Sequence, residues 1–125
     1  MTTASEFKMS GIRIPPQNVE AEKALLGAVM LRPHAIHELS GELTKEAFYS
    51  DKHRIIYGVM LDLLANNEPI DLVVLSAKLK EKKLLDNIGG ASYLTDLVGN
   101  APSTNNIANY AALIQKSYVL RNLIE

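Results

Sequence analysis

Two adjacent glycines, Gly89 and Gly90, stand directly before a helix-like run in the stretch LLDNIGGASYLTDL. Glycine-rich turns at helix starts can bind phosphate through backbone amides. A nucleotide-binding P-loop also needs a second glycine at a fixed spacing, a lysine and a hydroxyl residue, and this stretch has no lysine. A dinucleotide-binding fingerprint needs three spaced glycines that follow a strand. The glycine pattern and the strand are both missing here. We therefore expect a tight turn in which a glycine adopts a positive φ angle.

The three histidines, His34, His37 and His53, are the other side chains that could support metal or acid–base chemistry. His34 and Glu38 could share one helix face, with His37 beside them. The zinc-protease pattern H-E-x-x-H is absent, and the chain has no cysteine. We expect solvated surface histidines, no metal and no cofactor. No nucleophile elbow or evident acid pair indicates catalysis either.

A dense basic cluster, KLKEKK, supplies Lys78, Lys80, Lys82 and Lys83. These lysines could bind phosphates of a nucleic acid. They could equally form a solvated helix end, where positive charge complements the helix dipole. Aromatic residues do not alternate with them, which argues against a stacking platform for single strands. Because the net charge is −1, we expect at most weak DNA binding.

Tyr93 follows the glycines and flanks Leu94, Leu97 and Val98, which form the expected buried face of its helix. One interpretation is a core-edge tyrosine whose hydroxyl stays in water. The other is an anchor for a protein partner, because tyrosine is common in interface hot spots. The residues alone leave both interpretations open.

The composition indicates one soluble globular domain. The chain has 125 residues, of which 47% are hydrophobic and 22% charged, so it can bury a core without disulfides. No apolar run approaches the length of a membrane span, and the start of the chain lacks the apolar region of a secretory signal. We expect a cytoplasmic protein with no membrane contact.

Apolar residues recur at helical spacing throughout, and no segment alternates with period two over a useful length. The sequence therefore predicts an all-α fold, a compact bundle of about six or seven helices over residues 15–125, after a flexible tail at 1–14. Asn18, Ser50 and Asp71 are expected N-caps, because their side chains can accept from the first backbone amides. Expected helices cover 19–31, 33–40, one turn after Thr44, 51–66, a segment after Asp71, 91–99 and about 105 to the end, with Ser103 or Thr104 as the last cap.

The last helix carries apolar residues on more faces than one small core can use, namely Tyr110, Leu113, Leu120, Leu123 and Ile124. Exposed apolar area of this kind marks an interface, so we expect self-association. The closing stretch YVLRNLIE also has no helix stop signal, which predicts that the helix continues in a longer protein.

Four stretches, taken in order, resemble the N-terminal domain of DnaB-type replicative DNA helicases. They are IPPQNVEAEKALLGAVML, FYSDKHRIIYGVM, PIDLVVLSAKLKEKKLLDNIGGASYLTDL and PSTNNIANYAALIQ. Each motif alone has little specificity, but the four keep their order and spacing over residues 12 to 125.

The resemblance implies a non-catalytic, all-helical domain that assembles into a collar of dimers arranged as a trimer and docks primase. The parent would be a bacterial hexamer that unwinds duplex DNA, with ATP and Mg²⁺ bound in a motor domain absent here. The chain would end before or within a C-terminal helical hairpin. The resemblance places primase near that hairpin and implicates the aromatic position matching Tyr93, so Tyr93, Leu123 and Ile124 are the expected contacts. A helicase loader is a further possible partner.

Two alternatives stay open beside this interpretation. One is a freestanding helical nucleic-acid-binding module that uses Lys78 to Lys83, which salt-sensitive DNA binding would favour. The other is a small enzyme with an active site assembled from dispersed residues, which would require turnover by the isolated domain.

Overall fold

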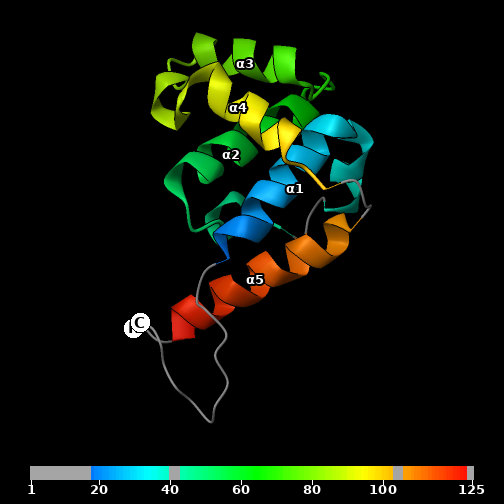
Figure 1. The fold of residues 1–125 in the computed structure, drawn as a ribbon, viewed down its shortest axis with the longest axis vertical. Coiled ribbons are helices and arrows are strands. Elements are labelled where there is room, and N and C mark those ends of the chain that lie inside the picture. The colour runs from blue at the N-terminus through cyan, green and yellow to red at the C-terminus, as the bar shows by residue number, and fades with distance from the viewer. Residues whose placement is uncertain (1–17, 40–42, 103–105, 124–125) are drawn as a thin grey trace.

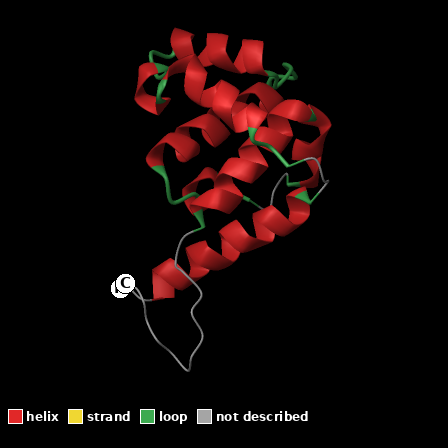
Figure 2. Cartoon of the chain, in the orientation of Figure 1, coloured by secondary structure: helices red, strands yellow, loops and turns green. Residues whose placement is uncertain are grey.

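A computed structural model describes residues 18–39, 43–102 and 106–123 (Figure 1). Within these ranges every regular element is helical and no strand is present (Figure 2), which confirms the all-α prediction. The predicted tail at 1–14 and the predicted cap at Ser103 or Thr104 lie outside the described residues. In the described part of the chain, no helix is long and apolar enough to cross a membrane. The α-helices are α1 (Val19–Leu31), α2 (Asp51–Ala65), α3 (Leu72–Glu81), α4 (Gly90–Gly99) and α5 (Ile107–Leu123), and the 3-10 helices are η1 (Pro33–Glu38), η2 (Lys45–Ala47) and η3 (Asp86–Ile88).

Helix α1 is the centre of the bundle and packs most extensively against α5 and α4 (Figure 1). Its Leu25, Leu26 and Val29 are fully buried. Gly27 lets α4 approach closely, because a Cβ at this position would lie 2.3 Å from the carbonyl oxygen of Leu97. The crossing of α1 and α4 therefore depends on a missing side chain.

Of the caps predicted at Asn18, Ser50 and Asp71, two are confirmed, and Thr44, also predicted as a cap, makes no side-chain capping bond. The Asn18 side chain accepts from the backbone N–H of Ala21 at 3.0 Å, and that of Asp71 accepts from Val74 at 2.8 Å. The third prediction is wrong in its mechanism, because Ser50 precedes α2 but its side chain makes no capping bond. Its backbone N–H instead donates to a buried carboxylate on α1, which is described below.

The predicted helix at 33–40 is a 3-10 helix that covers Pro33–Glu38, and the turn after Thr44 is the 3-10 helix η2. Segments this short close few i→i−4 bonds, so the tighter i→i−3 ladder is a common alternative. A third 3-10 helix, η3, was not predicted.

The glycine pair forms the expected turn. Gly89 has φ 101° and Gly90 has φ 79°, a region that residues with a Cβ rarely adopt. Their backbone amides donate to the carbonyls of Asp86 at 3.2 Å and Leu85 at 2.9 Å. Because both amides are already hydrogen-bonded within the chain, the turn does not present them to a phosphate.

Candidate partner-binding site around Tyr93

Glu22 of α1 and His53 of α2 form a buried polar pair. Glu22 is 1% exposed and His53 is 0% exposed, and Glu22 Oε1 lies 2.8 Å from His53 Nδ1. We assign the hydrogen to Nδ1, because an ionised carboxylate can only accept. The carboxylate thereby fixes both the tautomer and the orientation of the imidazole.

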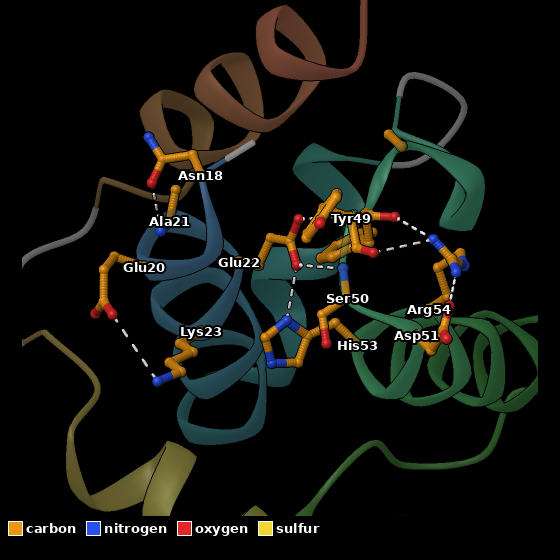
Figure 3. A network of polar contacts seen from close by, with 12 residues as sticks. Asn18, Glu20, Ala21, Glu22, Lys23, Tyr49, Ser50, Asp51, His53 and Arg54 are labelled. Atoms are coloured by element: carbon orange, nitrogen blue, oxygen red, sulfur yellow. Dashed lines mark hydrogen bonds and ion pairs between the residues drawn. The ribbon is translucent and has the colours of Figure 1, made fainter. Parts of the chain in front are cut away.

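The same carboxylate holds the chain that enters α2 (Figure 3). Glu22 Oε2 accepts from the backbone N–H of Tyr49 at 2.6 Å, and Oε1 accepts from that of Ser50 at 3.3 Å. Arg54 fastens this segment from the other side by donating to the carbonyls of Phe48 at 2.8 Å and Tyr49 at 3.2 Å. The first turn of α2, which carries His53, is therefore fixed relative to α1.

The network continues to α4 through the hydroxyl of Tyr93, which lies 2.6 Å from His53 Nε2. In a neutral imidazole protonated at Nδ1, Nε2 is the acceptor and the tyrosine hydroxyl donates to it. Glu22, His53 and Tyr93 thus connect α1, α2 and α4 in one chain of hydrogen bonds. Among the described residues, no buried side-chain nitrogen or oxygen lacks a partner.

The ring of Tyr93 is half-buried and restrained on its face as well as at its hydroxyl. Its centroid lies 5.9 Å from that of His53, with 21° between the ring planes. The ammonium of Lys52 sits 3.9 Å from the tyrosine centroid, which is a cation–π distance. Burial raises the pKa of Tyr93, and the negative charges of Glu22, Glu20 and Asp96 raise this pKa further.

Glu22, His53 and Tyr93 share the order of acid, base and hydroxyl found in nucleophilic catalysis, but not the required environment. Attack by Tyr93 would require its phenolate, whereas the pKa of Tyr93 is raised, which disfavours that form. The adjacent base, His53, is fully buried, so a substrate cannot reach its ring. The network therefore holds a side chain in position and does not favour the small-enzyme alternative.

Tyr93 lines a cleft between α1 and α4. Glu20 and Lys23 of α1 line one wall, while Asp96 and Leu97 of α4 line the other beside Tyr93. The exposed part of the aromatic ring is thus bordered by charged side chains of both signs. A site of this kind, with an aromatic surface inside a polar rim, suits contact with another protein. Within the described ranges, no cluster of three potential metal ligands occurs.

The sequence-based interpretation of His53 as a solvated surface residue is wrong, because the side chain is enclosed between α1, α2 and α4. His34 and His37 are exposed as predicted, and their rings lie 6.5 Å apart. The core-edge interpretation of Tyr93 is right about its packing against the core but wrong about its hydroxyl, which is bonded to His53. The role of Glu22 was missed entirely.

The basic cluster is partly neutralised by acidic neighbours. Lys78 Nζ lies 3.6 Å from Glu81 and 3.9 Å from Glu68, and Lys82 Nζ lies 3.7 Å from Asp62. These ion pairs favour a solvated helix end over a phosphate-binding surface. The remaining two lysines of the cluster, Lys80 and Lys83, are exposed at or just beyond the end of α3.

The apolar residues predicted for self-association lie along α5 in different environments. Leu113 is 44% exposed and Leu123 is 74% exposed. Leu120 is half-buried, and Tyr110 packs in part against the core. Val119, which the sequence analysis did not select, is also exposed. Ile124 lies outside the described residues.

Tyr93 and Leu123 do not form one continuous surface. Leu123 is the last residue of α5, and that end of the helix extends away from the rest of the bundle (Figure 1). Helix α4, which carries Tyr93, lies toward the opposite end of the molecule. A single compact partner would therefore have to extend along much of this chain's helical bundle to contact both Tyr93 and Leu123.

The fold and its residues match the N-terminal domains of replicative helicases. The family model described as the DnaB-like helicase N-terminal domain matches residues 14–116. The chain belongs to the family of DnaB-like helicase N-terminal domains, as its sequence motifs indicated.

Similar proteins of known sequence include two replicative DNA helicases. The replicative DNA helicase DnaC of Bacillus subtilis and the replicative DNA helicase DnaB of Geobacillus stearothermophilus are each 44% identical over 112 residues, which is 90% of this chain. The match covers 25% of each of these proteins, so the chain spans about a quarter of their length.

Two solved structures show the same fold. The N-terminal domain of DnaB helicase from Mycobacterium tuberculosis is 36% identical with a TM-score of 0.83, over 88% of this chain and 80% of that one. A DnaB-like replicative helicase, solved in a study of its interactions with primase, is 33% identical with a TM-score of 0.76. This second match covers 86% of the present chain and 25% of the helicase.

Proposed function

We propose that this domain is a non-catalytic assembly and docking domain of a bacterial replicative DNA helicase, which receives primase at Tyr93. The observation that carries the proposal is the tyrosine itself, an aromatic ring held in the wall of a cleft by two partners on α2, His53 and Lys52. The interactions of a DnaB-like relative with primase indicate the class of partner.

The environment of Tyr93 suits an interface anchor. The ring is half-buried and packs against the core, while its other part remains open to the cleft between α1 and α4. Tyrosines in this situation offer a large, rigid apolar area to a partner and are frequent hot spots. The exposed Leu123 at the end of α5 is the second expected contact, together with Ile124.

Helix α5 supports the proposed role in assembly. Leu113, Val119 and Leu123 expose apolar area that the bundle itself does not cover. Such area is commonly covered by another copy of the same chain, and two-fold dimers are the commonest closed arrangement. The domain would thus contribute to the collar of a cytoplasmic hexamer, in which a loader is a further partner.

The unwinding of duplex DNA belongs, in this proposal, to a motor domain that binds ATP and Mg²⁺. The described residues contribute no phosphate-binding turn, because the amides of Gly89 and Gly90 are used within the chain. The role of this domain is therefore to assemble the helicase hexamer and to bring primase to it. Its DNA contacts through α3 are weak.

The test is a titration of primase against the parent domain and its Tyr93→Ala variant. Loss of a true anchor should cost about 2 kcal/mol or more, which is roughly a thirtyfold loss of affinity. Tyr49→Ala is the matched control, because Tyr49 is an equally large aromatic residue that is 47% exposed and does not line the cleft. Unchanged affinity of Tyr93→Ala, with the melting temperature intact, would remove Tyr93 from the site.

Self-association is tested separately by sedimentation over a range of concentrations. The unmodified domain should form dimers as its concentration rises. The double variant Leu113→Ser, Leu123→Ser should shift this equilibrium toward monomer. A strict monomer at high concentration would contradict the assembly role of α5.

A further inference from the structure

The hydroxyl of Tyr93 is used inside the domain and is therefore unlike that of an ordinary surface tyrosine. It lies 2.6 Å from His53 Nε2, to which it donates when the imidazole is neutral and protonated at Nδ1, and His53 is in turn held by Glu22 at 2.8 Å. What remains for a partner is the exposed part of the ring. The hydroxyl is bonded to His53, and His53 and Glu22 are themselves almost completely buried.

We propose that His53, held by Glu22, is a positioning residue that fixes the Tyr93 ring in its binding orientation before the partner arrives. The inference rests on the proposed docking function and adds two residues that no partner can touch. It names the buried Glu22–His53 pair as a determinant of affinity at a surface site.

The physical reason is the cost of ordering a side chain on binding. An interface side chain that is mobile in the free protein loses rotamer freedom when its partner binds, at a cost of affinity. The hydrogen bond to His53 and the ammonium of Lys52 over the ring impose this order in the free domain. Binding therefore gains from a ring that is already in place.

The network also explains why the arrangement is rigid. The carboxylate of Glu22 accepts from two backbone amides as well as from His53, so α1 cannot move relative to the start of α2 without breaking three bonds. The groups that face the His53 ring are the Glu22 carboxylate from α1 and the Tyr93 hydroxyl from α4. A merely structural pair would stabilise the fold without any effect on affinity, and this difference can be measured.

Four variants separate positioning from stability. His53→Asn places an amide where Nδ1 lies and keeps the bond to Glu22, but has no atom at the position of Nε2. His53→Gln reaches the position of Nε2 and can hold the Tyr93 hydroxyl. Tyr93→Phe keeps the ring and removes only the hydroxyl, and Tyr93→Ala removes the ring.

The first measurement is the χ1 rotamer distribution of residue 93 in the free domain, from NMR three-bond couplings of its β protons. In the unmodified domain one rotamer should dominate, because the ring is held by His53 and Lys52. In His53→Asn and in Tyr93→Phe several rotamers should be populated. A ring that is equally fixed in His53→Asn would overturn the proposal, because His53 would not control it.

The second measurement is the affinity for primase, taken well below the melting temperature of each variant. His53→Asn and Tyr93→Phe should each weaken binding by roughly two- to tenfold, as expected for one side chain that must be ordered on binding. The double variant should bind no more weakly than either single variant, because both remove the same hydrogen bond. His53→Gln should restore part of the affinity, because its amide reaches the Tyr93 hydroxyl but lacks an atom at the position that bonds Glu22.

The results distinguish this proposal from the docking function on which it rests. If Tyr93→Ala weakens binding thirtyfold while His53→Asn and Tyr93→Phe bind like the parent, docking at Tyr93 stands and positioning is refuted. If Tyr93→Ala binds like the parent, the docking function fails and the positioning role fails with it. Should His53→Asn not fold, Tyr93→Phe decides alone, and parental affinity of that variant refutes the proposal.

Discussion

Replacement of Gly27 by alanine is the sharpest test of the packing that positions α4. The added Cβ would lie 2.3 Å from the carbonyl oxygen of Leu97, 3.1 Å from its carbonyl carbon and 3.0 Å from the Cβ of Ala101. Ordinary contacts of this kind begin near 3.4 Å, so α1 and α4 must separate by roughly 1 Å. The obstacle is backbone, which cannot rotate away as a side chain can.

Two opposing effects determine the magnitude. Alanine in place of glycine within a helix contributes about 1 kcal/mol of stability through helix propensity. Overpacking a well-packed core typically costs about 1–3 kcal/mol, and a clash with backbone belongs at the upper end or beyond. We therefore expect Gly27→Ala to lower the free energy of unfolding by about 2 kcal/mol or more, and the melting temperature by roughly 6 °C or more.

The assay is urea and thermal unfolding followed by far-ultraviolet circular dichroism, with Gly58→Ala as the matched control. Gly58 lies within α2, where an added Cβ would meet the side chain of Lys45, with its Cδ at 3.1 Å and its Nζ at 3.8 Å, and that flexible side chain can move aside. Gly58→Ala should therefore stabilise the domain by about 0.5–1 kcal/mol. The reasoning is refuted if Gly27→Ala is as stable as the parent, or if both variants change stability in the same direction.

Three further predictions concern single features of the fold. Burial raises the pKa of Tyr57 to about 12 from 10.0, so the unfolded chain loses this proton first and stability should fall by about 1.4 kcal/mol per pH unit between these values. In urea unfolding of Tyr57→Phe, the free energy of unfolding should fall less over this pH range than it does for the unmodified domain. An equal fall in both proteins would show that groups other than Tyr57 cause it. Asp71→Ala removes the N-cap of α3 and should cost about 1 kcal/mol in the same assay, whereas a cost near zero would show that the cap is dispensable. Exchange of Lys80, Lys82 and Lys83 for glutamine should leave a weak DNA affinity at physiological salt nearly unchanged, and loss of a sub-micromolar interaction would restore the nucleic-acid-binding alternative.

Features that depend on neighbouring residues could be predicted from the sequence. Asn18 and Asp71 cap their helices through bonds to amides three residues ahead, so a local pattern contains all the information needed. The same holds for the turn at Gly89 and Gly90, where positive φ angles select glycine. The assignment of an all-α fold rested on many such local signals.

The polar network could not be predicted in this way, because its bonds join residues that are far apart in sequence. His53 is 31 residues from Glu22 and 40 residues from Tyr93. Glu22 stands in the first turn of α1, where an acidic residue has a sufficient local explanation in the helix dipole. That local explanation concealed a buried carboxylate, which also accepts the amide of Ser50 that precedes α2. Only the packing of α1 against α2 shows its role.

Mapping the primase contact by NMR tests the central claim most directly. Amide and side-chain shifts of the isotopically labelled domain would be followed while unlabelled primase is added. Docking at Tyr93 predicts that the largest changes fall on Tyr93, on its neighbours in α4 and on the cleft wall formed by α1. Changes confined to the lysines at the end of α3, with the signals of Tyr93 unmoved at saturation, would contradict it.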